Sequence, residues 1–140
     1  MSRTWRAPWW RLAETGDKMK IAIALGADGV SLAHFGHAER FDVYDDSNGL
    51  FLKTESRLNS PPCGREDSGA LMSAAARLVS DCAAVVAARF GPCALREVGS
   101  SGVFPFEMAG ILDKRLLSGL TRLRDFLPGG RSKHGRNNTA

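Results

Sequence analysis

Two short apolar runs constrain the fold of this chain more than any other feature. The first, KIAIALG (Lys20–Gly26), is β-branched and apolar and ends in glycine; the second is CAAVVAA (Cys82–Ala88). Runs of this length and composition are typical of strands buried in the centre of a sheet. A helical pattern precedes the second run, and a crossover helix between the two runs predicts that they pair in parallel.

A hairpin and a helix are predicted between the two runs. RFDVYD (40–45) alternates polar and apolar residues, SNG (47–49) supplies a turn, and LFLKTESR (50–57) is the returning strand. The proline-containing stretch LNSPPCGRED is predicted as a loop, and Asp67 or Ser68 can cap the helix that follows. The apolar face of that helix is predicted at Leu71, Ala74, Ala75, Leu78 and Val79.

Three further elements complete the predicted order. They are a short helix over 91–99 with Pro92 in its first turn and Gly99 as its stop, a strand over 102–106 that Pro105 confines to an edge, and a helix from Glu107 to about Leu127 that Gly110 and Gly119 weaken or divide. The order β-β-β-α-β-α-β-α indicates an α/β fold with a mixed five-stranded sheet flanked by helices.

Charge and length bound the domain organisation. The chain has 140 residues and a net charge of +4. We expect one domain over 19–127, a poorly ordered extension over 1–18 that holds all three tryptophans, and a disordered basic tail over 128–140. The two ends hold 7 basic and 2 acidic residues, which leaves 12 basic and 13 acidic residues in the domain. This balance disfavours a nucleic-acid-binding face.

Two further observations concern location and redox chemistry. No apolar run reaches the roughly 18 residues of a membrane span, and no signal-peptide pattern is found, so a cytoplasmic location is expected. The three cysteines are odd in number and form no CxxC pair, which argues against a disulfide framework and a zinc ribbon.

The predicted topology brings distant side chains to one edge of the sheet. If the strand over 50–57 and the strand over 82–88 both run parallel to the first, their carboxyl ends share an edge, where ligands of open α/β sheets gather. The loops at that edge carry His34, His37, Cys63 and Cys93. Cys82 precedes its strand at the opposite edge and is predicted to be a small buried hydrophobic residue.

These donors predict the kind of ligand. Imidazole and thiolate together suit zinc, copper or iron–sulfur species. The loops lack the short spacings of a structural zinc site, so an open pocket that takes up and releases a larger metal species fits better. The turn at Gly91–Cys93 opens a helix, whose exposed N–H groups attract negative charge.

Several of these motifs resemble one known family. MKIAIALGADGVSLAHFGHAERFDVYD and NSPPCGREDSGALMSAAARLVSDCAAVVAARFGPCA are similar to the dinitrogenase iron–molybdenum cofactor biosynthesis family. That family includes NifX-like carriers and the C-terminal domain of NifB-type proteins. The resemblance covers about Lys20 to Gly119.

The resemblance implies a ribonuclease-H-like fold and a non-enzymatic accessory protein for nitrogen fixation. Such a protein transiently binds an iron–sulfur or iron–molybdenum-type cluster and carries it to nitrogenase assembly proteins or apo-nitrogenase. His34 matches the family's HFG histidine, His37 matches the HFGHA form, and the three cysteines match those of the NifB-like subset. The expected cofactor-binding residues are His34, His37, Cys63, Arg89 and Cys93, with His34, Cys63 and Cys93 as metal ligands.

The sequence also departs from the family. Ala88-Arg89 replaces a Gly-Gly pair of many relatives, and Arg89 either reaches an anion or points into solvent. No radical-SAM cysteine motif is present, so the cluster-building part of NifB-type proteins is absent from this sequence.

Three other functions compete with that of a cluster carrier. The main alternative is a non-catalytic interaction or regulatory module of the same fold that binds an apo-enzyme partner. A nuclease is disfavoured because KIAIAL contains no carboxylate for two-metal chemistry. A Cys–His hydrolase is disfavoured because no carboxylate stands out to orient the histidine.

Overall fold

The structure, a computed structural model, describes residues 19–47, 50–62 and 66–126. The expected terminal extension and tail, and the cysteine at position 63, lie outside these residues. No helix within the described residues is both long and apolar enough to span a membrane.

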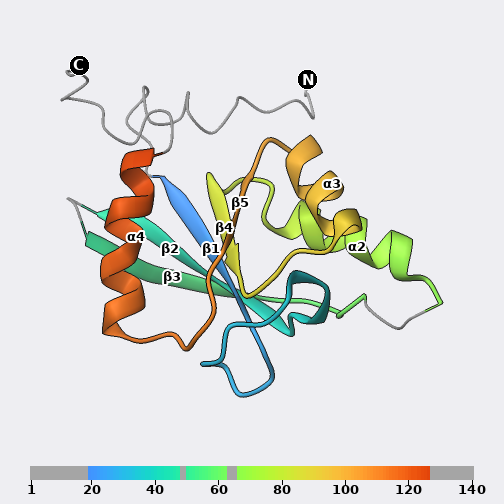
Figure 1. Cartoon of the computed structure of the whole chain (residues 1–140), viewed down its shortest axis with the longest axis horizontal. Coiled ribbons are helices and arrows are strands. Elements are labelled where there is room, and N and C mark those ends of the chain that lie inside the picture. The colour runs from blue at the N-terminus through green and yellow to red at the C-terminus, as the bar shows by residue number, and fades with distance from the viewer. Residues whose placement is uncertain (1–18, 48–49, 63–65, 127–140) are drawn as a thin grey trace.

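A five-stranded mixed sheet forms the centre of the molecule (Figure 1). Its strands are β1 (Lys20–Leu25), β2 (Arg40–Ser47), β3 (Leu50–Leu58), β4 (Ala84–Ala87) and β5 (Phe104–Glu107), in the order β3-β2-β1-β4-β5. β2 is antiparallel to both β1 and β3, whereas β1, β4 and β5 run parallel. The ribonuclease-H-like mixed α/β sheet expected from the sequence is therefore confirmed.

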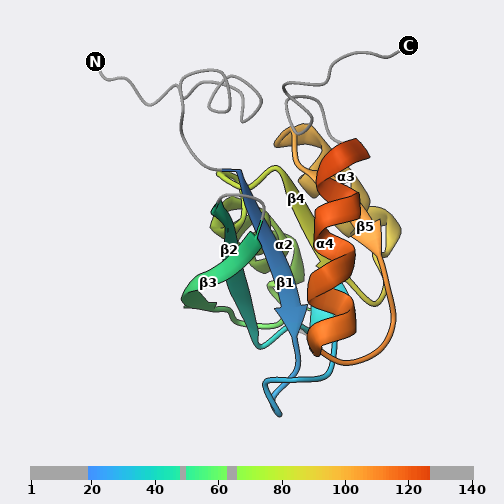
Figure 2. The same ribbon diagram turned by 90° about the vertical axis from the view of Figure 1, so that its left-hand side faces the viewer.

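Helices cover both faces of the sheet (Figures 1 and 2). α2 (Ser68–Leu78) and α3 (Pro92–Ser100) lie on one face, and α4 (Lys114–Phe126) lies on the other. β1 is buried on both sides because Ala22 and Ala24 face α2 and α3, while Ile21, Ile23 and Leu25 face α4. This double burial explains why the first run is continuously apolar.

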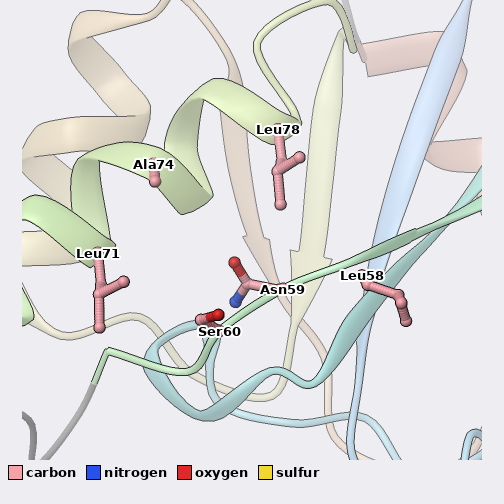
Figure 3. A pocket seen from close by; sticks show the side chains of 6 residues that line it. All are labelled: Leu58, Asn59, Ser60, Leu71, Ala74 and Leu78. Atoms are coloured by element: carbon pink, nitrogen blue, oxygen red, sulfur yellow. The ribbon is translucent and has the colours of Figure 1, made fainter.

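The buried face of α2 differs from the predicted one. The residues that enter the core are Met72, Ala75, Ala76 and Val79. Ala75 and Val79 were predicted correctly, but Leu71, Ala74 and Leu78 are only partly covered and line a cavity beside the end of β3 (Figure 3). The helix is therefore rotated by about one residue from the orientation that leucine positions suggest.

The helix predicted from Glu107 is shorter than expected. Glu107 ends β5 and α4 begins only at Lys114. The segment between them pairs with the loop after β1: Leu32 N–H donates to the Gly110 carbonyl over 3.0 Å, and Leu112 N–H donates to the Val30 carbonyl over 2.7 Å. Gly110 has a φ of 129°, so it divides the predicted helix.

The end of α3 also differs slightly from the prediction. Gly99 lies inside the helix, which ends at Ser100 with Ser101 as the C-cap. The left-handed backbone position belongs to Gly102, whose φ is 81°.

An ion pair joins the sheet to the turn that follows α2. The Arg57 guanidinium donates to Asp81 Oδ1 over 2.7 Å and Oδ2 over 3.1 Å, and also to the Leu78 carbonyl over 2.6 Å. Lys20 Nζ lies 3.5 Å from Asp81 Oδ2. The contacts join β3 and β1 to the turn between α2 and β4.

The Asp81 carboxylate makes stability depend on acid. Burial alone would raise its pKa, but the hydrogen bond and charge of Arg57 outweigh burial and lower the pKa to about 2. The ionised Asp81 carboxylate makes its full contribution to the free energy of unfolding above the ordinary aspartate pKa. That contribution is lost as pH falls through the lowered pKa. We expect Asp81→Asn to lower the free energy of unfolding by about 2 kcal/mol at pH 7 and by much less at pH 2. Urea denaturation at both pH values measures this, and equal losses would contradict it.

Alanine substitutions at Gly110 and Gly119 should change the stability of the protein in opposite directions. Gly110→Ala places a side chain at a positive φ and should cost about 1–3 kcal/mol. Gly119 lies inside α4, and a Cβ added there meets no atom within 4 Å. Gly119→Ala should therefore stabilise the protein by about 0.5–1 kcal/mol. Urea denaturation of both variants tests the two predictions. A Gly110→Ala variant as stable as the wild type would contradict the positive φ of Gly110.

Candidate functional site

Backbone hydrogen bonds join several loops into one rim at the carboxyl ends of β1, β3, β4 and β5. The rim is defined here as residues 26–39, 59–62, 88–93 and 108–113. Asn59 N–H donates to the Glu39 carbonyl over 3.0 Å, and its side-chain amide donates to the Ala38 carbonyl over 2.9 Å. Together with the bonds from Gly110 and Leu112, these contacts hold the loop after β1 against its neighbours.

The loop after β1 returns to pair with the chain that leaves β4. Ala88 N–H donates to the Ala33 carbonyl and Phe35 N–H donates to the Arg89 carbonyl, each over 2.9 Å. His34 and Arg89 consequently form a parallel bridge. Residues paired side by side in a ladder project their side chains from the same face, so His34 and Arg89 leave the rim together.

An aromatic cluster fixes the turn that carries both histidines. The Phe35 side chain is fully buried, with its ring centroid 5.6 Å from that of Phe90 and 5.4 Å from that of Phe41. Residues 35–37 form a short 3₁₀ turn in which Phe35 and Gly36 are buried. His34 and His37 flank this buried pair and are exposed, with ring centroids 5.5 Å apart in an edge-on arrangement. One guest can thus contact both imidazoles.

The Asp-Gly turn predicted after β1 is present and is held by Asp28. Its carboxylate accepts hydrogen bonds from the Ser31 hydroxyl over 2.6 Å and from the Ser31 and Val30 N–H groups over 2.8 and 3.0 Å. These bonds, with that of the Ser31 hydroxyl foremost, lower the pKa of Asp28 to about 2. Gly29 takes a φ of 76°, which completes the turn.

The cysteines occupy different environments. Cys93 is the second residue of α3, is half-buried against the core, and has its sulfur 3.7 Å from an Arg96 nitrogen. Cys82 is fully buried at the opposite edge, and burial raises the pKa of its thiol, as expected for a small buried hydrophobic residue. Cys63 lies outside the described residues, so its place at the rim stays a prediction.

The structure gathers only part of the predicted set. It brings His34, His37 and Arg89 together, and it places Cys93 on the helix that begins at the same rim. Among the residues that the structure describes, no three His, Cys, Asp or Glu side chains form a group that could hold a metal ion. The proposed metal-ligand set includes Cys63 and is therefore not tested.

A cavity beside the rim was not anticipated. It has a volume of about 250 Å³ (Figure 3) and is lined by Leu58, Asn59, Ser60, Leu71, Ala74 and Leu78. Asn59 connects it to the histidine turn through the bonds to Ala38 and Glu39. Leucine spacing predicted Leu71 and Leu78 in the core; Leu78 does pack against it, but both side chains also line this cavity.

Comparison with known proteins identifies the class of this domain. The family model described as dinitrogenase iron-molybdenum cofactor matches residues 17–117. The FeMo cofactor biosynthesis protein NifB of Frankia alni is 30% identical in a 99-residue alignment that covers 67% of this chain and 19% of that protein. The chain thus spans about a fifth of the length of this curated relative.

A solved structure supports the fold alone. A protein of Methanocaldococcus jannaschii, provisionally described as a dinitrogenase, aligns with a TM-score of 0.53 and 10% identity over 79% of this chain and 92% of that one.

Because the family model covers most of the chain, the chain belongs to the dinitrogenase iron–molybdenum cofactor family. Both the family description and the name of the NifB relative refer to the iron–molybdenum cofactor.

The aromatic cluster should control the order of the histidine turn. We expect Phe35→Ala to cost about 3–5 kcal/mol, because it removes a fully buried ring. Hydrogen exchange of the residue 35 amide should accelerate by more than the global loss of stability explains, since its bond to the Arg89 carbonyl depends on this packing. Phe104→Ala, at a ring that is 44% exposed, is the control and should cost about 1 kcal/mol or less. Equal losses of stability in the two variants would contradict the role of Phe35 in holding the histidine turn.

Proposed function

We propose that this domain is a non-catalytic accessory protein that binds a metal–sulfur cofactor of the iron–molybdenum type, or its precursor, and passes it on. The observation that carries the proposal is the pair of exposed imidazoles on a buried turn, in a chain of this family. Nitrogenase assembly proteins or apo-nitrogenase would receive the cargo, in the cytoplasm.

The residues at the rim suit such a cargo chemically. Imidazole nitrogen binds iron and related metals, and thiolate sulfur favours iron–sulfur species. Within the described residues, neither imidazole is engaged in a hydrogen bond or an ion pair, so their ring nitrogens are available to a guest. Cys93 would supply a sulfur ligand from the start of α3, and Cys63 would supply another if its loop closes on the same rim.

The rim also suits exchange of the cargo. His34 and His37 are exposed, so a cluster held there stays accessible to a second protein. The backbone beneath them is fixed by the Phe35 cluster and by the bonds to residues 88–90, which limits the ordering that binding requires. Binding on a fixed, open surface permits both capture and release.

Loss of the two histidines should weaken cluster binding. We expect wild-type protein, reconstituted anaerobically with iron, sulfide and molybdate, to be coloured, and His34→Ala/His37→Ala to bind the cluster at least about tenfold more weakly. Elemental analysis, the electronic spectrum and a binding titration provide the measurements. Cys82→Ala is the matched thiol control, because its sulfur is buried at the other edge. Colourless, metal-free wild-type protein would overturn the proposal.

An interaction module remains the alternative, and the surface gives it one specific support. Val30 and Ile111 are 47% and 53% exposed and lie on adjoining loop segments of the rim, where Ser31 pairs with Ile111. One or both of these exposed apolar side chains would contact an apo-enzyme partner. Partner binding that survives His34→Ala/His37→Ala but fails in Val30→Ser/Ile111→Ser, with no cluster bound by the wild type, would favour the alternative.

A further inference from the structure

We infer that Arg89 selects the cargo by its charge: its guanidinium holds an anionic group of the cluster while the histidines contact metal. The inference rests on the proposed function and adds a specificity-determining residue and a property of the substrate, its net negative charge.

The backbone places this cation beside the imidazoles. Arg89 and His34 are partners in a parallel bridge, and the bond from Phe35 N–H to the Arg89 carbonyl fixes their register. On the other side, Phe90 N–H donates to Glu107 Oε2 over 3.0 Å, and the Phe90 ring packs on Phe35. Arg89 is therefore mounted on a backbone held from both neighbouring segments, while its own side chain is exposed.

The charge of Arg89 is not neutralised by the protein. Arg40 pairs with Asp42, and Arg57 pairs with Glu55 and Asp81. In the part of the chain that the structure describes, no carboxylate lies within ion-pair distance of Arg89, and its guanidinium has no hydrogen-bond acceptor. Beside His34 and His37, this leaves a positive charge at the place where a guest would sit.

The guanidinium of Arg89 and the imidazoles of the two histidines bind different parts of a cluster. Arginine stays protonated and offers only N–H donors, so it cannot coordinate a metal. Its planar fork binds acceptors that carry negative charge, such as bridging sulfides, thiolates or carboxylates on a cluster. A bare divalent cation at the imidazoles is repelled by the same charge. Arg89 should therefore favour anionic clusters over free metal ions.

The test compares two probes of opposite charge on the same protein. The probes are a synthetic iron–sulfur cubane with thiolate ligands, which is a dianion, and Co²⁺ alone, each titrated anaerobically at low salt into wild type, Arg89→Met and Arg89→Lys. We expect Arg89→Met to bind the cubane about tenfold more weakly and Co²⁺ about two- to fivefold more tightly. Arg89→Lys, which keeps the charge, should retain most of the preference. Raising the salt concentration should shrink both differences.

The controls separate charge selection from damage to the fold and from failure of the proposed function. Arg122→Met changes an exposed arginine on α4, on the other face of the sheet, and should alter neither affinity. Arg89→Met that weakens both probes equally, or changes neither, would overturn the inference while leaving cluster binding by the wild type intact. A wild type that binds no cubane and no reconstituted cluster would overturn the proposed function, and the inference with it.

Discussion

The pairing of residues 33–35 with residues 88–90 is the constraint on which the rim depends. The chain that leaves β1 turns back on itself, with Gly26 N–H bonded to the Ser31 carbonyl over 2.9 Å, and then runs alongside the chain that leaves β4. Those bonds satisfy backbone groups that would otherwise be left unpaired beside the core. They also set His34 opposite Arg89, so the positions of the imidazoles and of the guanidinium follow from one register.

Burial of Phe35 turns that register into a rigid support. Its ring packs between Phe90, which follows β4, and Phe41, which belongs to β2, so one side chain locks segments from three parts of the sequence. A sharp turn then exposes the residues on either side of the buried pair. Donors presented on a packed backbone keep their relative positions without a bound guest, which is how a binding surface limits the entropy lost on binding.

The sequence was sufficient for the sheet but not for all helix faces or for the contacts between loops. The strand from Lys20 was predictable because burial on two faces leaves a continuous apolar run. The strand from Arg40 was predictable from its alternation, but that alternation hides the burial of Asp42 and Tyr44 on the second face. The face of α2 was not, since consecutive alanines at 74–76 fit either of two overlapping faces. The break at Gly110 depends on a bond to Leu32, about 80 residues earlier in the chain, which no local pattern encodes. Likewise, the shared edge of His34, His37 and Cys93 followed from the predicted topology, but the bridge between His34 and Arg89 required coordinates.

The environments of Cys82 and Cys93 show why a matching residue is not necessarily a ligand. The resemblance implied a match to family cysteines at both positions, yet Cys82 lies in the core with its thiol pKa raised by burial and with the Asp81 carboxylate 3.7 Å from its sulfur. A metal ligand must be a thiolate, and here both burial and the neighbouring negative charge oppose ionisation. Cys93 has an arginine nitrogen rather than a carboxylate beside its sulfur, and it lies at the edge that carries the histidines. Position in the sheet therefore favours Cys93 over Cys82 as a ligand of the proposed cluster, whereas Cys82 packs in the core at the opposite edge.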